Sequence, residues 1–267
     1  SGKVLESENP KFKEGDEVIL TGFRVGEIFY GGYSQIAKVN GDFLVKKPKD
    51  LTSKQAMILG TAGFTSLMSA FAIKAREEIL LGEKVNNVLV TGATGGVGSI
   101  AVAVLAFLGY EVACVTGNVN KNTPFLKDIG ATKIIERKSL AEPSNKTLES
   151  AVWGGCIDTV GGIMLARILS QMKHETAVAA IGNAGDSSLP ASVIPFLLRG
   201  IKLIGIDSAS KETPKRIRAW ERLSSDLPPH MLDLISTEIT LSEVIQAGKD
   251  ILAGNTFGRL VVNVKDA

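Results

Sequence analysis

The sequence has very few of the residues that bind transition metals or form disulfides. Its 267 residues include two cysteines and two histidines, Cys114, Cys156, His174 and His230, and all four are far apart along the chain. A zinc site built from such residues needs four ligands, usually with pairs at short spacing. A bound metal is therefore not expected. The cysteines are interpreted as buried reduced thiols, which fits a cytoplasmic protein.

Net charge and long apolar runs are also scarce. The formal net charge of +2 comes from 30 basic and 28 acidic residues, so the composition gives no sign of a nucleic-acid or acidic partner. We expect no apolar run near the roughly 20 residues that a membrane span needs. The start, Ser1-Gly2-Lys3, contains no signal-peptide hydrophobic region. The chain is long enough for two domains, and its 45% hydrophobic residues can fill two separate cores. No membrane contact is expected.

A glycine-rich segment over residues 88–101 organises the rest of the chain. Its sequence, VLVTGATGGVGSIA, combines an apolar strand pattern, a glycine turn and a helical pattern in that order, as a dinucleotide-binding turn requires. Gly92 and Gly95 are expected to adopt angles that a side chain forbids, and Gly96 to let the main chain approach a pyrophosphate. Gly98 would allow the helix to pack tightly on the strand, with the helix N-terminus facing the anion. The alternative is a purely structural turn.

Residues 1–59 look different from the rest, because short strand patterns follow one another between glycine turns. Strands are predicted over residues 4–6, 12–22, 31–39 and 43–45. This pattern is typical of a small barrel. Three or four strands cannot close a barrel, so we expect part of it to lie ahead of Ser1.

From residue 88 onward, strand and helix patterns alternate. Further strands are predicted over residues 111–116, 133–136, 156–160, 176–181 and 202–206. Helices are predicted over residues 94–108, 123–129, 148–152, 162–172 and 192–199. Six parallel strands with crossover helices define an α/β fold, a doubly wound parallel six-stranded Rossmann sheet.

The segments on either side of this sheet complete the predicted organisation. A helix beginning near residue 52 breaks at residues 60–63 and resumes over residues 64–79. Helices over 214–225 and 241–252 precede a last strand over 259–264, which would return to the barrel. The predicted domains are therefore a partial barrel (1–59), a dinucleotide-binding domain (60–213) and C-terminal helices and strand that return to the barrel (214–267).

The residues after the second sheet strand favour NADP over NAD. An NAD-selective site places an acidic side chain about 20 residues after the glycine turn, where it binds the ribose hydroxyls. Here the strand ends in TGNVNK, residues 116–121, without an acid. Thr116 and Asn118 can donate to a 2′-phosphate, and Lys121 can supply positive charge. An ordinary polar turn at Thr116 and Asn118 is the alternative.

Six short segments carry a resemblance to a known family, and the resemblance extends over residues 2–264. They are GGYSQ at 31–35, GTAGFT at 60–65, GATGGVG at 92–98, IDTVG at 157–161, PFLLR at 195–199 and GIDS at 205–208. In order and spacing they resemble the zinc-independent quinone oxidoreductases of the medium-chain dehydrogenase/reductase superfamily, and most of all the YhdH/AcuI type, the acrylyl-CoA reductases. The resemblance implies a GroES-like β-barrel domain beside the Rossmann domain, with NADP(H) bound between them. It also implies a segment ahead of Ser1 with an active-site Asn-Tyr pair.

The resemblance also implies cofactor contacts. The pyrophosphate would lie against Thr94, Gly95, Gly96 and Val97, and the 2′-phosphate against Thr116, Gly117 and Asn118, where the family often has Ser-Gly-Arg. Asn183 and Ser208 would line the nicotinamide half, with Leu197 and Arg199 nearby. Thr61 and Thr65 would lie near the nicotinamide or the phosphates. Arg259 is a further candidate for binding a phosphate. Asp158, at the end of a predicted strand, is explained equally well as the cap of the turn at residues 161–162.

The implied reaction is NADPH-dependent reduction of an activated C=C bond, as in an acrylyl-CoA-like thioester, or of a quinone, by hydride transfer without zinc. Tyr30 and Arg24 lie in a loop between barrel strands and are candidate substrate contacts, with a solvated loop as the alternative reading. The catalytic acid is not assigned by these residues. A small-molecule substrate is thus expected, and a homodimer through the apolar edge strand over residues 201–206.

Two other classes of protein share features with this sequence. Short-chain dehydrogenases share the glycine pattern but need a tyrosine followed four residues later by lysine. Tyr30, Tyr33 and Tyr110 are followed there by serine, alanine and cysteine, so this class is excluded. A non-catalytic NADP-binding or structural protein, as in the crystallin-like relatives, stays the alternative function.

Overall fold

The computed structural model describes residues 1–79 and 86–265, which form two compact units. The first unit combines Ser1–Phe64 with Asp207–Ala267, and the second is the continuous segment Thr65–Ile206. The first unit is therefore built from both ends of the chain. The domain bounds predicted from the sequence (1–59, 60–213 and 214–267) stay a prediction, because these units are defined by packing alone.

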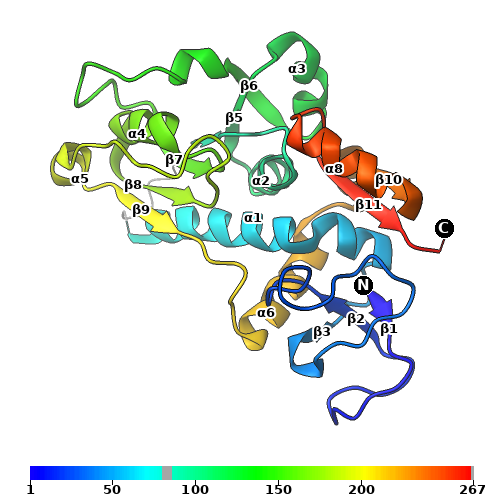
Figure 1. Cartoon of the computed structure of the whole chain (residues 1–267). Coiled ribbons are helices and arrows are strands. Elements are labelled where there is room, and N and C mark those ends of the chain that lie inside the picture. Colours follow the sequence, from blue (N-terminus) through cyan, green and yellow to red (C-terminus); the bar gives the residue numbers. More distant parts are fainter. Residues whose placement is uncertain (80–85, 266–267) are drawn as a thin grey trace. The chain divides into compact units, whose positions relative to one another are not determined.

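The second unit contains a sheet of six parallel strands in the order β6-β5-β4-β7-β8-β9 (Figure 1). The strands are β4 (Asn87–Val90), β5 (Glu111–Thr116), β6 (Ala131–Glu136), β7 (Trp153–Asp158), β8 (Met172–Ala180) and β9 (Lys202–Gly205). Successive strands run outward on one side from β4 to β6 and on the other from β7 to β9. The carboxyl ends of β4, β5 and β7 therefore border the switch point at which such sheets bind ligands. The predicted doubly wound α/β fold is confirmed.

Both faces of this sheet are buried, which explains why its strands read as continuous apolar runs. On one face Leu89, Cys156 and Val178 share a core with residues of α4 (Gly162–Ser170). On the other face a side chain at Gly155 would meet Ile73 of helix α1 (Ser53–Ile79), with only 2.8 Å between the added Cβ and Cγ2 of Ile73. The absence of a side chain at Gly155 thus allows the helix to pack closely on the strand.

The crossover helices differ from prediction in two places. They are α2 (Gly96–Phe107), α3 (Val119–Asp128), α4 and α5 (Ile194–Arg199), with a 3₁₀ turn η2 (Arg137–Leu140) after β6. Helix α3 begins four residues before the predicted start. The helix predicted over residues 148–152 is wrong: the N–H groups of Glu149 and Val152 donate to Ser170 and Gln171, at 3.0 and 2.8 Å. These tertiary hydrogen bonds replace the helical ones in this segment.

Both cysteines are buried as free thiols, as the sequence predicted. Cys114 lies in β5 and Cys156 in β7. Burial raises the pKa of Cys114 to about 12, and burial raises that of Cys156 well above its usual range. The thiolate is the reactive form of cysteine, so neither residue is suited to nucleophilic chemistry.

The first unit contains two small sheets. Strands β1 (Gly2–Lys3), β2 (Glu17–Leu20) and β3 (Leu44–Lys46) form an antiparallel sheet over a core of Phe12, Val18 and Leu44. Strands β10 (Ser236–Thr240) and β11 (Arg259–Asn263) form a parallel pair. The helices of the C-terminal segment are α6 (Thr213–Asp226), α7 (Pro229–Ile235) and α8 (Val244–Leu252), and two 3₁₀ turns are η1 (Gly41–Phe43) and η3 (Leu241–Glu243). The sequence had not predicted β10 or α7.

Two N-terminal strand predictions are wrong. The first strand is at residues 2–3 and not at 4–6, and residues 31–39 form no strand. An alternating pattern becomes a strand only when another strand pairs with it. None of the strands in the described part of the chain pairs with residues 31–39, and Tyr33 and Ile36 are exposed there.

Helix α1 corrects the expectation about apolar runs. Among the described residues, the segment Ser53–Ala75 is long and apolar enough to cross a membrane by length and composition. However, 72% of its most apolar window is buried, as in the core helix of a globular protein. The helix is kinked at Gly60, where φ is +48°, at the position where the sequence predicted a break.

Candidate dinucleotide-binding site

The glycine turn after β4 is as tight as its sequence predicts. Gly92 has φ of +56°, and a Cβ there would lie only 2.2 Å from Oγ1 of Thr159. A Cβ on Gly98 would lie 2.2 Å from the carbonyl oxygen of Gly92, so this glycine lets the first turn of α2 pack against the loop itself. The expectation for Gly95 is wrong: its φ of −79° is open to any residue. Its N–H donates to Gly92 at 2.9 Å and closes the turn.

The start of α2 is suited to bind an anion. Gly95 is its N-cap and provides no side-chain hydrogen bond, and the first N–H groups of any helix lack partners within the helix. These groups belong to Gly96, Val97 and Gly98, next to Thr94. The hydroxyl of Ser66 donates to the carbonyl of Val97 at 2.9 Å and fixes this turn. Free donors and the positive end of the helix dipole together suit a phosphate group.

Asp158 ties the ends of β4 and β7 together beside this turn. The carboxylate is fully buried; it accepts from Oγ1 of Thr91 at 2.7 Å and from the N–H of Gly161 at 2.8 Å. Burial raises its pKa, while these hydrogen bonds act in the opposite direction. The interpretation of Asp158 as the cap of the turn at residues 161–162 is confirmed. The Cα of Asn183 lies 3.5 Å from the Cβ position of Gly161, so Asn183 is at the same carboxyl edge of the sheet.

Thr116, Gly117 and Asn118 follow β5 at the neighbouring strand end. Thr116 is 4% exposed, whereas Gly117 and Asn118 are exposed. Asn118 is the N-cap of α3, because its Oδ1 accepts from the N–H of Lys121 at 3.0 Å. This role had not been predicted, and it explains why α3 begins at Val119. The amide of Asn118 thus orders the loop through its oxygen.

Arg137 is a site residue that the sequence reasoning missed. Its guanidinium lies against Gly117: Cζ and Nη2 are 3.3 Å from the position of a Cβ there. In the described part of the chain this guanidinium has no hydrogen-bond or ion-pair partner, and the residue is exposed. The register of the sheet explains the contact, because Thr116 of β5 pairs with Glu136 of β6. The residues that follow two adjacent parallel strands lie side by side. The position of an arginine directly after β6 could therefore have predicted from the sequence that it lies beside the end of β5.

Two residues of α5 had been expected near the nicotinamide. The guanidinium of Arg199 donates to the carbonyls of Ser170 and Met172 at 2.8 and 2.9 Å, and Met172 begins β8. Arg199 therefore holds the amino end of β8, opposite to the edge with the glycine turn. Leu197 lies on the same helix with 72% of its surface exposed, and Thr65, on α1, is 5% exposed.

The remaining cofactor candidates lie in the first unit. Nε of Arg259 donates to the carbonyl of Ile58 at 2.8 Å, two residues before the kink at Gly60. Burial lowers the pKa of Arg259. Arg259 therefore stabilises the kink beside Thr61. The carbonyl of Ser208 accepts from Arg216 at 2.8 Å.

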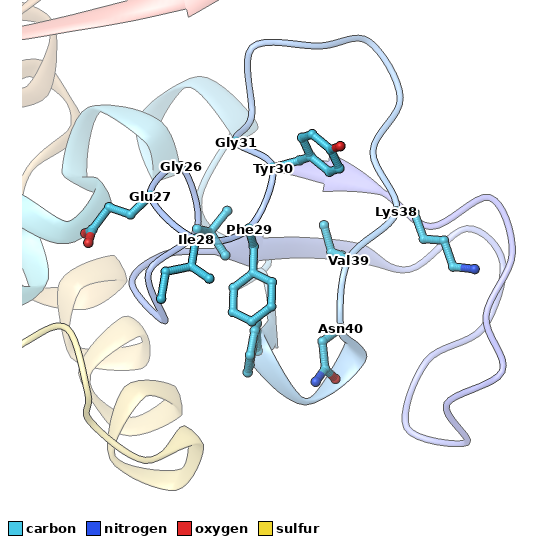
Figure 2. A pocket seen from close by; sticks show the side chains of 11 residues that line it. Gly26, Glu27, Ile28, Phe29, Tyr30, Gly31, Lys38, Val39 and Asn40 are labelled. Carbon is cyan, nitrogen blue, oxygen red and sulfur yellow. The ribbon is translucent and has the colours of Figure 1, made fainter.

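Residues 25–31, 38–40 and 43 of the first unit surround a hollow of about 490 Å³ (Figure 2). Its lining includes Ile28, Phe29, Tyr30, Lys38, Val39 and Phe43. Tyr30 is 96% exposed, and the side chains of Glu27 and Lys38 point away to opposite sides in Figure 2. Arg24 is not part of the lining and pairs with Glu27, at 3.2 Å between Nε and Oε2. Of the two predicted substrate contacts, the hollow therefore includes Tyr30 alone.

The residues that the structure describes contain no group of three or more His, Cys, Asp or Glu side chains that could hold a metal ion. His174 is exposed within β8. The donor set of the site is thus made of backbone N–H groups, hydroxyls and a guanidinium, which suits phosphate groups better than a metal.

A doubly wound sheet with a phosphate-binding turn at its switch point defines a dinucleotide-binding protein. Residues 96–225 match the family model of zinc-binding dehydrogenases. The acrylyl-CoA reductase AcuI of Ruegeria pomeroyi is 50% identical over 264 residues, which cover 99% of this chain and 79% of that protein.

Two solved structures are similar over nearly the whole chain. The yhdH oxidoreductase from Salmonella enterica in complex with NADP has a TM-score of 0.93 and 43% identity, covering 98% of this chain and 79% of that one. The yhfP protein of Bacillus subtilis, with NAD bound, has a TM-score of 0.92 and 44% identity, again covering 98% and 79%. The chain belongs to the medium-chain dehydrogenase/reductase superfamily, in the family that includes AcuI, YhdH and YhfP.

Proposed function

We propose that this protein is an NADPH-dependent oxidoreductase that reduces an activated C=C bond, as in an acrylyl-CoA-like thioester, or a quinone, by hydride transfer without zinc. One observation carries the choice of cofactor: the guanidinium of Arg137, which has no partner among the residues that the structure describes, lies against Gly117. Dinucleotide-binding sheets place the adenosine ribose at the end of this second strand, and an arginine there accommodates a 2′-phosphate. The relative from Salmonella enterica, with NADP bound, supports the same choice.

The cofactor contacts follow from the two edges of the site. The N–H groups of Gly96 and Val97 would bind the pyrophosphate, with Thr94 and Gly95 beside it, and Thr116, Gly117, Asn118, Lys121 and Arg137 would surround the 2′-phosphate. Asn183, Leu197 and Thr65 of the second unit, and Thr61, Ser208 and Arg259 of the first, stay predicted contacts of the nicotinamide half or the phosphates. The chain thus provides donors for every phosphate of NADPH.

The bound NADPH supplies the hydride. An enoyl thioester accepts the hydride at its β carbon and a proton at its α carbon, and the developing enolate charge needs a donor near the carbonyl oxygen. Tyr30 is the proposed donor, at a hollow whose volume of about 490 Å³ is that of a small-molecule site. The side chains of Ile28, Phe29 and Val39 would provide apolar surface for the alkene.

Assembly and setting belong to the same proposal. The first unit is taken as part of a GroES-like barrel, and the protein as a cytoplasmic homodimer that binds neither nucleic acid nor membrane. The edge strand β9 supports the dimer, because Leu203 and Ile204 are only half-buried there and such an apolar edge needs a partner. The two free thiols support a reducing compartment.

The test is a titration with NADPH and with NADH, followed by addition of acrylyl-CoA and, separately, of a quinone while NADPH oxidation is recorded. Preferential NADPH binding with turnover of either acceptor supports the proposal and identifies the acceptor. Binding without turnover of any acceptor favours the alternative, a non-catalytic NADP-binding or structural protein. Failure to bind either nucleotide contradicts the assignment of the glycine turn.

Replacing Arg137 tests the choice of cofactor directly. Arg137→Gln is expected to weaken NADPH binding about 10- to 100-fold, since hydrogen bonds to charged groups contribute about 1.5–3 kcal/mol. NADH binding is expected to change less than twofold, because NADH lacks the 2′-phosphate. Isothermal titration calorimetry measures both affinities. The matched control is Lys138→Gln, which removes the same charge from the adjacent exposed residue; an equal loss in both variants would show that only long-range charge matters.

A further inference from the structure

Asn122 controls the hydroxyl of Thr116, the buried polar group at the end of β5. Asn122 lies on α3 and is 6% exposed. Its Nδ2 donates to Oγ1 of Thr116. Within the part of the chain that the structure describes, the Thr116 hydroxyl makes this one hydrogen bond. The Thr116 oxygen is therefore occupied as an acceptor, and its proton is left for another group.

This arrangement has a chemical consequence. A hydroxyl has one proton to donate, and an amide N–H on its oxygen directs that proton elsewhere. A phosphate only accepts hydrogen bonds at this position, whereas a ribose hydroxyl both donates and accepts. A ribose hydroxyl can also accept from a fixed donor, but the hydrogen bond to the charged phosphate is the stronger of the two, so a hydroxyl fixed as a donor favours the phosphate.

Asn122 also has a feature that packing alone does not explain. Its Oδ1 is buried and has no hydrogen-bond partner in the described part of the chain. Leaving a buried acceptor unpaired is unfavourable, and an apolar residue of similar volume would avoid this. Compared with an apolar residue of similar volume, the carboxamide of Asn122 gains the hydrogen bond to Thr116.

We propose that Asn122 is a positioning residue for cofactor selectivity: it fixes the Thr116 hydroxyl as a donor to the 2′-phosphate of NADPH. This inference rests on the proposed NADPH-dependent function. Two contributions to the preference for NADPH then come from different residues. Arg137 supplies the positive charge, and the Asn122–Thr116 pair supplies a hydroxyl whose proton points to the 2′-phosphate.

The experiment compares NADPH and NADH dissociation constants of the full chain with those of four variants. Asn122→Leu keeps the volume and removes the donor. It is expected to weaken NADPH binding about tenfold, the lower end of the effect of one hydrogen bond to a charged group, while the melting temperature does not fall. Asn122→Asp leaves only acceptors beside Thr116, so that the hydroxyl proton turns inward, and the loss should be larger.

A double-mutant cycle gives the decisive reading. Thr116→Val is expected to lose as much NADPH affinity as Asn122→Leu, and the double variant no more than Thr116→Val alone, because both changes remove one interaction. Additive losses, or equal losses for NADPH and NADH, would show that Asn122 is merely structural and overturn the inference. An unchanged preference for NADPH in Asn122→Leu would overturn it as well, while leaving the proposed function intact. A wild-type chain that binds neither nucleotide would overturn both.

Discussion

Gly98→Ala is expected to lower NADPH affinity at least tenfold and the free energy of unfolding by about 1–3 kcal/mol, the usual range for overpacking a close contact. The new methyl group would lie 2.2 Å from the carbonyl oxygen of Gly92, 2.8 Å from its carbonyl carbon and 2.9 Å from Cα of Ala93. All three are backbone atoms. No change of rotamer can relieve the contact, so the turn itself must move.

The loss of affinity follows from what that movement displaces. The carbonyl of Gly92 accepts the N–H of Gly95 at 2.9 Å, and this hydrogen bond sets the direction in which α2 begins. When the carbonyl moves, the N–H groups of Gly96 and Val97 change direction with it. Hydrogen bonds to a charged phosphate depend on geometry, and each contributes about 1.5–3 kcal/mol.

Calorimetry with NADPH and urea unfolding measure the two effects separately. The matched control is Gly248→Ala, which introduces the same methyl group in helix α8, where the new Cβ has no neighbour within 4 Å beyond the adjoining helix backbone. Alanine is favoured over glycine inside a helix, so this variant should bind NADPH normally and be at least as stable. Normal NADPH binding by Gly98→Ala would contradict the assignment of this turn to the pyrophosphate.

The parts of the fold that the sequence predicted are those with local signals. The strand before Gly92 is a short apolar run, and the glycines mark the turn by their own conformational needs, as the φ of +56° at Gly92 shows. The six-stranded sheet follows because runs of this kind alternate with helical patterns. Such signals do not depend on distant parts of the chain.

The parts that were wrong depend on a partner elsewhere. Residues 31–39 have the pattern of a strand but no pairing strand in the described part of the chain. Residues 148–152 have a helical pattern, yet Ser170 and Gln171 bind their N–H groups. Arg137 was missed for the same reason, because the register between β5 and β6 places it beside Gly117. Tertiary hydrogen bonds override weak local preferences.

Arg216 is the clearest example of a residue that sequence patterns cannot single out. It is one of several basic residues on α6, but it is 1% exposed. Its guanidinium donates to the carbonyls of Lys211, Ser208 and Ala209 at 2.8, 2.8 and 2.7 Å. It also lies over the ring of Phe23, at 4.5 Å to the centroid. Phe23 has φ of +52° and Arg24 of +58°, so this contact stabilises a loop in an unfavourable backbone conformation.

Arg216→Met is therefore expected to lower the free energy of unfolding of the first unit by about 2–4 kcal/mol, since three carbonyls lose a charged donor and a strained loop loses its contact. Urea unfolding followed by tryptophan fluorescence measures this. Trp220 is buried on the same helix and reports on the first unit, whereas Trp153 reports on the second unit. The matched control is Arg218→Met, an exposed position two residues further along α6, for which a change within about 0.5 kcal/mol is expected. Arg216→Lys retains the charge without the planar fork and should fall between the two. If Arg216→Met were as stable as Arg218→Met, the guanidinium would not be what holds the loop of residues 21–24 to α6.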